Sequence, residues 1–186
     1  MKIVITGHTT GLGKSLYDFL VDQGHTVVGL SRSNGFDLSH NLDMFLLNNW
    51  DVFINNAYYE FKQTELLYKL FELNKERNCT IVNICSVSAD GNYDRVNQYA
   101  IHKSSLDKAC FQLQLIDSNC KVVCVKLGRM QTPMVAHIKN MPKMNTQWIA
   151  QYLVYNVIYV PDQILIKNIT IDLMHSRQPL DHNQTE

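Results

Sequence analysis

The chain has 186 residues, 46% of them apolar and 18% charged, a composition typical of one globular domain rather than of a disordered chain. Lysine and arginine together number 17, as do aspartate and glutamate, so the formal net charge is zero. This balance argues against a protein that binds nucleic acid or an anionic membrane surface, because such proteins usually carry a basic surplus.

Cysteine spacing and apolar runs indicate the compartment. The five cysteines include no Cys-x-x-Cys pair, which argues against a disulfide scaffold and a structural zinc site. The most apolar late stretch, residues 148–160, contains polar residues and is shorter than the ~20 residues that a membrane helix needs. The first residues form too short an apolar run for a secretory signal. We therefore expect a cytoplasmic protein with neither a membrane span nor a metal site.

Strand-like and helix-like segments alternate along the chain. Residues 2–6 form an apolar, β-branched run that ends at a glycine, and residues 12–20 carry apolar side chains three and four positions apart. After a stop at Gly24, residues 26–30 form a second apolar run. The same patterns predict strands at 36–38, 52–54, 80–84, 121–126 and 168–171, and helices at 42–48, 60–76, 97–117 and 146–156.

This alternation predicts a doubly wound α/β fold, Rossmann-like, in which helices cover both faces of a parallel sheet. We expect a single domain over residues 1–174, followed by a polar tail over residues 175–186. The region between the second and fourth strands is short, with room for only the edge strand at 36–38 and one helix. A helix that is usual in dinucleotide-binding folds is therefore expected to be missing.

A glycine-rich segment, Thr6-Gly7-His8-Thr9-Thr10-Gly11-Leu12-Gly13, joins the first strand to the first helix. Glycine permits a tight turn with positive φ and lets the backbone approach a diphosphate, which accepts hydrogen bonds from the helix N-terminus. A plain strand-to-helix turn is the alternative. Because the segment follows the first strand of a βαβ unit, we favour a dinucleotide site.

Gly13-Lys14-Ser15 also resembles the end of a P-loop, which would indicate a nucleoside-triphosphate enzyme. That motif requires a glycine five positions before Gly13, where the sequence has His8. The nearest glycine, Gly7, is one residue out of register. We therefore regard the P-loop as the less favoured interpretation.

The end of the second strand reads Leu30-Ser31-Arg32-Ser33-Asn34 and carries no carboxylate. In dinucleotide folds an acid near this position binds the ribose 2′-hydroxyl of NAD, whereas an arginine accommodates the 2′-phosphate of NADP. Arg32 between two hydroxyls therefore favours NADP(H) over NAD(H), since a guanidinium fork suits a dianionic phosphate. A solvated surface arginine in a turn is the alternative.

Ser86 closes a predicted strand, and Tyr99 and Lys103 lie four residues apart on the next predicted helix, hence on one face. A free tyrosine has a pKa near 10, and we expect the ammonium of Lys103 to lower the pKa of Tyr99. Tyr-x-x-x-Lys alone is common and otherwise marks an exposed helical pair. Here it follows a strand-end serine and a phosphate-type loop.

Together these motifs resemble the short-chain dehydrogenase/reductase family, from the first strand to about Thr132. The resemblance includes Thr6-Gly7-x-x-x-Gly11-x-Gly13, Asn55-Asn56-Ala57, Ser86 with Tyr99-x-x-x-Lys103, Asp37-Leu38, and Gly128 with Thr132. It implies hydride transfer between a nicotinamide and a carbonyl or alcohol carbon, with Tyr99 as proton donor or acceptor, Ser86 positioning the substrate oxygen and Lys103 holding the nicotinamide ribose. The implied cofactor residues are Gly7, Thr9, Thr10, Gly11, Leu12, Gly13, Ser31, Arg32, Asp37, Leu38, Asn55, Asn56, Ala57, Tyr99, Lys103, Met130 and Thr132.

The sequence departs from the family pattern at two points that bear on activity. Tyr58 stands where the family has a glycine after Asn-Asn-Ala, and residues 58–73 contain no asparagine, although the family often has a catalytic one in that helix. Reduced activity or a different proton relay would follow. The resemblance also implies a homodimer or homotetramer, commonly formed through the helix of Tyr99 and the helix before it.

We therefore expect an NADPH-dependent reductase of a small carbonyl substrate, with reversible alcohol oxidation. A catalytically silent NADP-binding or sensor protein is the second hypothesis, and a P-loop enzyme the third.

Overall fold

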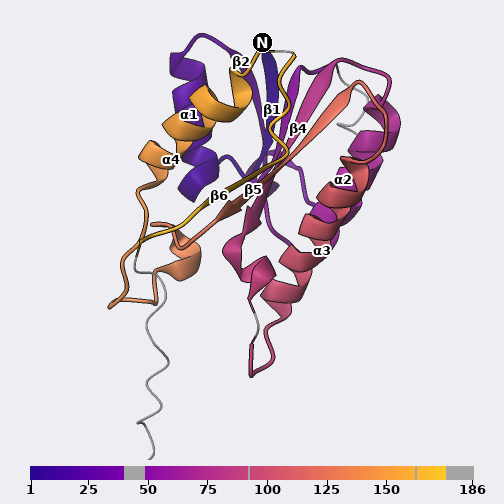
Figure 1. Cartoon of the computed structure of the whole chain (residues 1–186). Coiled ribbons are helices and arrows are strands. Elements are labelled where there is room, and N and C mark those ends of the chain that lie inside the picture. Colours follow the sequence, from indigo (N-terminus) through magenta and orange to yellow (C-terminus); the bar gives the residue numbers. More distant parts are fainter. Residues whose placement is uncertain (40–48, 92, 162, 175–186) are drawn as a thin grey trace, which may run out of the picture.

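A computed structural model describes residues 1–39, 49–91, 93–161 and 163–174, and within them the chain forms a six-stranded parallel sheet (Figure 1). The strand order is β2-β1-β3-β4-β5-β6. The strands are β1 (Lys2–Thr6), β2 (Thr26–Leu30), β3 (Val52–Asn55), β4 (Cys79–Ser86), β5 (Cys120–Leu127) and β6 (Asn168–Ile171). The predicted parallel α/β fold is confirmed.

Four α-helices of the described residues cover the two faces of the sheet. They are α1 (Gly11–Asp22), α2 (Lys62–Asn74), α3 (Gln98–Leu113) and α4 (Thr146–Leu153). Helices α1 and α4 lie on one face and α2 and α3 on the other (Figure 1). Short helical turns lie at η1 (Arg32–Asn34), η2 (Val87–Asp90) and η3 (Pro133–Val135), and a π-helical turn, η4 (Val154–Ile158), extends α4.

The core has two apolar layers because side chains of a strand alternate between the faces of the sheet. Val4 and Phe53 belong to the layer under α2 and α3, whereas Ile3, Ile5 and Ile54 belong to the layer under α1 and α4. Every residue of β3 is buried. A central parallel strand therefore reads as a continuous apolar run rather than an alternating one, as the sequence indicated.

The strand predicted at 36–38 is wrong. After β2 the chain forms the η1 turn, and Gly35 adopts a left-handed conformation with φ +83°. The amide of Phe36 then donates to the carbonyl of Ser31 at 2.9 Å, which turns the chain back instead of extending it. Phe36 and Leu38 are both buried in the core layer under α2 and α3. Their apolar character therefore reflects core packing of a loop and not sheet pairing.

Two other predictions, the helix at 42–48 and the polar tail at 175–186, lie outside the described residues. None of the helices in the described residues is long and apolar enough to cross a membrane.

The topology brings the functional candidates to one edge of the sheet. All neighbouring strands are parallel, so their carboxyl ends meet at the same edge, the lower one in Figure 1. After β2 the chain crosses to the other side of β1 to form β3. Open parallel α/β sheets usually bind their ligand in the crevice at such a reversal, outside the carboxyl ends of the strands. Ser86 and Leu127 are register partners at the ends of β4 and β5.

Candidate active site

The loop between β1 and α1 has the backbone form of a phosphate cradle. Gly11 has φ +57°, and a Cβ there would lie 3.0 Å from Cγ2 of Thr132. A Cβ on Gly13 would collide with the carbonyl oxygen of Gly7. Thr10 is the N-cap of α1, yet its side chain makes no capping hydrogen bond, and the first turn of the helix contains no acidic residue. The N-terminal N–H groups of α1 and the Thr10 hydroxyl therefore suit an anionic group.

The side chains of this loop face different surroundings. Thr9 and Thr10 are exposed, whereas Leu12 is buried in the core layer under α1 and α4. Of these three, Leu12 is able to contact a ligand only through its backbone. Lys14 forms an ion pair with Asp18 at 2.6 Å on the exposed side of α1, so its ammonium is paired along the helix and gives no support to a P-loop.

The ends of β1 and β3 are joined by polar side chains. The Thr6 hydroxyl accepts hydrogen bonds from the amides of Asn56 and Ala57, each at 2.9 Å, and Nδ2 of Asn56 donates to the carbonyl of Thr6 at 2.9 Å. A Cβ on Gly7 would lie 3.1 Å from Cβ of Ala57. The structure thus brings the predicted Asn56 and Ala57 against the glycine loop. Asn56 acts there as a brace between two strand ends.

Arg32 lies in a preorganised turn at the end of β2. The Ser31 amide donates to Oδ1 of Asn34 at 2.8 Å, and the hydroxyls of Ser31 and Ser33 lie 2.7 Å apart. Nδ2 of Asn34 donates to the carbonyl of Gly29 at 2.6 Å. Arg32 is exposed, and among the described residues its guanidinium has no ion-pair partner. The turn therefore presents a cation beside the crevice.

Asp37 and Leu38, the pair implied to lie near the adenine, have local partners in this structure. Oδ1 of Asp37 accepts the amide of Ser39 at 2.8 Å and its hydroxyl at 2.7 Å. The side chain of Leu38 is buried in the core. Contact of either residue with a cofactor stays a prediction.

Ser86 and Tyr99 come together although they belong to β4 and α3. Ser86 is buried, and its Oγ accepts the amide of Ser88 at 3.1 Å. Burial raises the pKa of the Tyr99 phenol, while a hydrogen bond with the Ser86 side chain lowers it, and burial is the larger effect. The ring of Tyr58 packs edge-on against that of Tyr99 with centroids 4.9 Å apart.

Lys103 lies beneath these rings, 3% exposed. Its Nζ donates to Oε1 of Gln63 at 2.7 Å and to the carbonyl of Ile84 at 2.8 Å. The same atom lies 5.8 Å from the ring centroid of Tyr99 and 5.4 Å from that of Tyr58. Burial lowers the pKa of Lys103 to about 8.

The expected lowering of the Tyr99 pKa by Lys103 is therefore wrong for this structure. Lys103 gives its hydrogen bonds to Gln63 and Ile84, and burial of the phenol raises the Tyr99 pKa. At neutral pH the phenol keeps its proton and is able to act as an acid.

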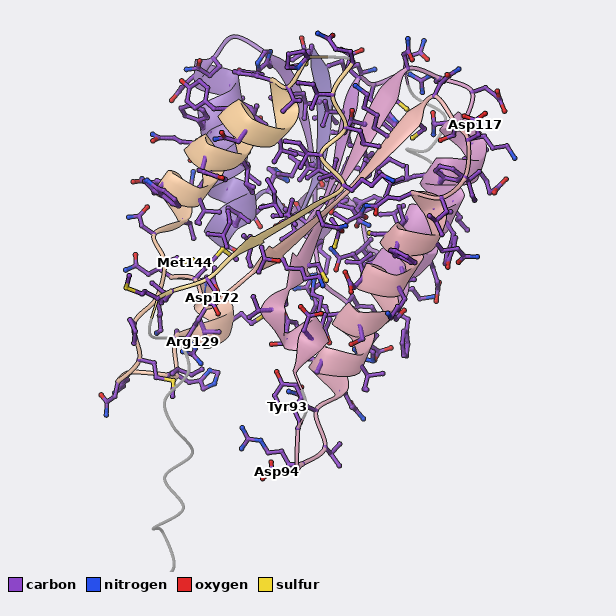
Figure 2. All side chains as sticks on the ribbon, viewed as in Figure 1. Tyr93, Asp94, Asp117, Arg129, Met144 and Asp172 are labelled. Carbon is purple, nitrogen blue, oxygen red and sulfur yellow. The ribbon has the colours of Figure 1, made fainter. Side chains whose placement is uncertain are left out.

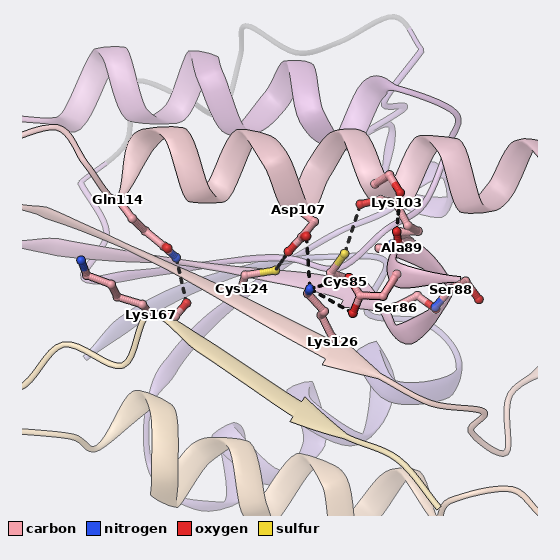
Figure 3. Close-up of polar contacts among 12 residues, drawn as sticks. Cys85, Ser86, Ser88, Ala89, Lys103, Asp107, Gln114, Cys124, Lys126 and Lys167 are labelled. Carbon is pink, nitrogen blue, oxygen red and sulfur yellow. Dashed lines mark hydrogen bonds and ion pairs between the residues drawn. The ribbon is translucent and has the colours of Figure 1, made fainter. Parts of the chain in front are cut away.

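A second polar cluster holds the turn that follows Ser86 (Figure 3). Lys126 of β5 contacts the two carboxylate oxygens of Asp90 at 2.9 and 3.1 Å and Oδ2 of Asp107 at 3.1 Å. Burial lowers the pKa of Lys126, but its hydrogen bonds to both aspartates outweigh that effect and raise the pKa. The Ser104 hydroxyl donates to the carbonyl of Ala89 at 2.5 Å. Strand β5 and helix α3 thus fix η2 and, with it, the position of Ser86.

The segment after β5 forms another wall at this edge. Met130 pairs with Met144 in an isolated parallel bridge, and the amide of Met144 donates to the carbonyl of Arg129 at 2.8 Å. Arg129, Met144 and Asp172 lie close to one another beyond the end of β5 (Figure 2). Thr132 lies close to Gly11 of the glycine loop, because a Cβ on Gly11 would be 3.0 Å from Cγ2 of Thr132. Contact of Met130 or Thr132 with a cofactor stays a prediction.

Three further polar residues lie at the candidate site; sequence reasoning noted Tyr58 only as a departure from the family glycine, gave His102 no role and did not identify Gln63. Gln63 binds Lys103, Tyr58 packs on Tyr99, and His102 accepts or donates a hydrogen bond with the Tyr58 hydroxyl at 2.8 Å through Nδ1. His102 also lines an open pocket of about 370 Å³ together with Glu60, Phe61, Gln98 and Ile101. Position alone could have indicated His102, which lies three residues after Tyr99. A contact between Gln63 and Lys103, 40 residues apart, leaves no local signal.

No protein-family model matches the chain. A fatty acyl-CoA reductase from Acinetobacter baylyi is 22% identical over 153 residues, which cover 79% of this chain and 48% of that protein. The chain thus spans about half the length of this curated relative.

Solved structures have the same fold at low sequence identity. A 3-alpha-hydroxysteroid dehydrogenase from Pseudomonas sp. B-0831, complexed with NADH, has a TM-score of 0.75 at 15% identity, covering 92% of this chain and 95% of that one. A short chain dehydrogenase from Burkholderia cenocepacia, in complex with NADP, has a TM-score of 0.77 at 16% identity, covering 93% and 88%. A 3-ketoacyl-(acyl-carrier-protein) reductase from Brucella melitensis, complexed with NADH, has a TM-score of 0.73 at 16% identity, covering 92% and 96%. The chain has the Rossmann-like fold of the short-chain dehydrogenases, and the resemblance predicted from the motifs is confirmed at that level.

The buried Lys103 makes a testable contribution to stability. Its pKa is about 8 in the folded chain and 10.5 in a solvated lysine, so the unfolded chain binds the extra proton between these values. Stability must therefore rise with pH across this window, by about 3 kcal/mol from this group. We expect urea unfolding to show the free energy of unfolding of the wild type rising relative to that of Lys103→Met between pH 8 and 10.

Lys108, an exposed lysine on the same helix, provides the control. The difference between wild type and Lys108→Met should stay constant over this pH range. A constant difference for Lys103→Met as well would contradict the burial of a charged amine.

Proposed function

We propose that the protein is an NADPH-dependent reductase of a carbonyl substrate, able to oxidise the corresponding alcohol in reverse. The observation that carries this proposal is the convergence of Ser86, Tyr99 and Lys103 at the strand ends, beside a loop suited to a diphosphate. The similar solved structures contain NADH or NADP, which supports the proposal, as does the similarity to a fatty acyl-CoA reductase.

The bound cofactor would supply a hydride to the carbonyl carbon. The phenol of Tyr99 donates its proton to the carbonyl oxygen as negative charge develops there, and the product is the alcohol. The Ser86 hydroxyl holds the same oxygen by a hydrogen bond, which fixes its distance to the phenol. The phenolate left on Tyr99 regains a proton from solvent. The Tyr99 phenol is protonated at neutral pH and so carries the proton that reduction requires.

Lys103 lies beneath the ring of Tyr99 and faces the position proposed for the cofactor. Its ammonium lies 5.8 Å from the ring centroid in a buried setting, where a charge is screened weakly. Two of its three N–H groups are already used by Gln63 and Ile84, which leaves one for the nicotinamide ribose that the resemblance implies.

The preference for NADPH rests on Arg32. This exposed cation stands at the end of β2 in a turn held by Ser31 and Asn34, without an ion-pair partner among the described residues. A guanidinium there would bind a 2′-phosphate at low ordering cost, because the turn is already formed. The cytoplasm, which supplies NADPH, remains the expected compartment.

Binding without turnover is a second candidate function, and one observation favours it. Tyr58 occupies the position of a family glycine, packs against Tyr99, and is tied to His102 by its hydroxyl. A side chain so placed narrows the space in front of the phenol. Tight NADPH binding without reduction of any carbonyl in a broad panel would support this candidate instead.

A homo-oligomer formed through α2 and α3 is also part of the proposal. The outer faces of these helices expose Tyr68, Leu73, Ile101 and Phe111, the last 58% exposed. Tyr68 and Gln112 are hydrogen-bonded at 2.7 Å, so the two helices present one continuous surface. An exposed apolar surface of this kind is typical of a protein–protein interface.

Tyr99→Phe tests the reductase. We expect kcat/KM for a reactive dicarbonyl to fall roughly 10²- to 10⁴-fold, because the proton donor is lost. The dissociation constant for NADPH, measured by fluorescence, should change little. Tyr155→Phe, a change at an exposed tyrosine of η4, should keep full activity. Unchanged turnover in Tyr99→Phe would exclude this phenol as the acid.

Arg32→Ala tests cofactor choice. Loss of a charge-assisted contact with a 2′-phosphate should weaken NADPH binding roughly 10- to 100-fold and NADH binding hardly at all. Titration of both cofactors against both proteins gives the comparison. Lys75→Ala, which removes a cation from the far end of α2, should leave both affinities unchanged. Equal weakening of NADPH and NADH in Arg32→Ala would defeat the 2′-phosphate argument.

Phe111→Asp tests the oligomer. A carboxylate placed in an apolar interface resists desolvation, so sedimentation velocity should show a shift from dimer or tetramer to monomer. Trp148→Asp, at an equally exposed ring on α4, should leave the oligomer intact. Should the wild type sediment as a monomer at micromolar concentration, this part of the proposal is lost.

A further inference from the structure

Gln63 is the centre of a buried hydrogen-bond network that joins three elements of the site. It is 2% exposed, near the start of α2. Its Nε2 donates to the carbonyl of Asn55 at 2.6 Å, at the end of β3, and to that of Ile84 at 3.0 Å, near the end of β4. Its Oε1 accepts from Nζ of Lys103 on α3 at 2.7 Å. One side chain therefore connects the ends of two strands with the amine that underlies Tyr99.

The orientation of the Gln63 amide is determined by these partners. Two backbone carbonyls face the nitrogen and accept hydrogen bonds only, so Oε1 must be the atom that faces Lys103. A reciprocal bond strengthens the arrangement, since Nδ2 of Asn55 donates to the backbone carbonyl of Gln63 at 2.9 Å. Nδ2 of Asn55 also donates to Oδ1 of Asn83 at 2.9 Å, which ties β3 to β4. Gln63 thus presents a fixed, neutral acceptor to the amine.

Among the described residues, the titratable groups next to Lys103 are thiols and phenols; Asp107, one turn further along α3, contacts Cys124 and is paired with Lys126. The thiols are Cys85 of β4, Cys110 of α3 and Cys124 of β5 on one side, and the phenols are Tyr58 and Tyr99 on the other. Hydrogen bonds with neighbouring thiols and, after them, burial raise the pKa of Cys85 and of Cys124, so both are neutral at physiological pH. Among the described residues no carboxylate forms an ion pair with Lys103.

We infer that Gln63 is a positioning residue for Lys103: it holds the amine at the end of β4 and offers it a neutral hydrogen-bond acceptor in place of a carboxylate. The consequence for turnover rests on the proposed function, whereas the effect on Lys103 itself does not. A neutral acceptor binds the ammonium of Lys103 without neutralising its charge. A carboxylate at the same place would cancel that charge and bind the proton more tightly.

Gln63→Glu replaces the neutral acceptor of Lys103 with a carboxylate, and Gln63→Met removes the acceptor. Both side chains are close in shape to glutamine. The measurement is an NMR titration of the protein carrying ¹³C-labelled lysine, in which the Cε signal of Lys103 is identified by its loss in Lys103→Met. In the wild type we expect a midpoint near 8. Gln63→Glu should raise the midpoint by about one pH unit or more, a tenfold or greater gain in proton affinity, and Gln63→Met should lower it. Gln112→Glu, the same change of charge at an exposed position of α3, should leave it unmoved.

A measurement on the wild type covers the case in which a variant does not fold. The side-chain amide signal of Gln63 should shift with the same midpoint as Cε of Lys103, because the two groups share a hydrogen bond. A Gln63 amide that stays constant through the titration of Lys103 overturns the inference. So does a folded Gln63→Glu protein in which the Lys103 midpoint equals that of the wild type.

Turnover is measured separately, as the pH profile of carbonyl reduction. If the wild type is active, the limb of the profile that follows Lys103 should move with its NMR midpoint in each variant, and a limb that stays in place contradicts the positioning role. If the wild type reduces no carbonyl while the NMR midpoints move as expected, the proposed function fails and the role of Gln63 stands.

Discussion

The arrangement of the candidate site depends on Lys103, a cation that is buried without an ion-pair partner in the part of the chain that the structure describes. An amine removed from water is costly unless hydrogen bonds replace its hydration, and the cost is reflected in the lowered pKa of Lys103. The chain meets this demand with neutral oxygens, one from Gln63 and one from the backbone of Ile84. Both acceptors must themselves be held in place, and this requirement extends the network to Asn55 and Asn83.

This network explains why polar side chains occur among otherwise apolar strand ends. Asn55 and Asn83 are register partners in β3 and β4, both fully buried, and their amides bind each other and neighbouring carbonyls. Their bonds keep the ends of β3 and β4 at the spacing that Gln63 requires. A second cluster, Lys126 with Asp90 and Asp107, performs the corresponding task for the turn after Ser86. Two separate polar clusters therefore position the two sides of the candidate site.

The similar solved structures share this fold but differ in the substrates that their names indicate. They include a 3-alpha-hydroxysteroid dehydrogenase, a short chain dehydrogenase and a 3-ketoacyl-(acyl-carrier-protein) reductase. Enzymes with one fold thus act on different substrates, so the reaction depends on the residues of the site rather than on the fold. Two contacts characterise the candidate site of this chain: the ring of Tyr58 packs against that of Tyr99, and Gln63 accepts a hydrogen bond from Lys103. Neither is implied by the motifs that indicated the family. Both act on the acidity or accessibility of the same phenol.

The sequence by itself determined the local features of this protein. The glycines between β1 and α1, the strand-end Ser86 and the four-residue spacing of Tyr99 and Lys103 follow from conformational preference and helical periodicity, which are properties of short segments. The apolar pattern at Phe36 and Leu38 was misleading, because burial in a loop and burial in a strand leave the same pattern. Only the tertiary structure decided that Gln63 supports Lys103 and that the pKa of Tyr99 is raised. Proton affinity depends on desolvation and on partners that are distant in sequence, and both arise only when the sheet and its helices close around the groups concerned.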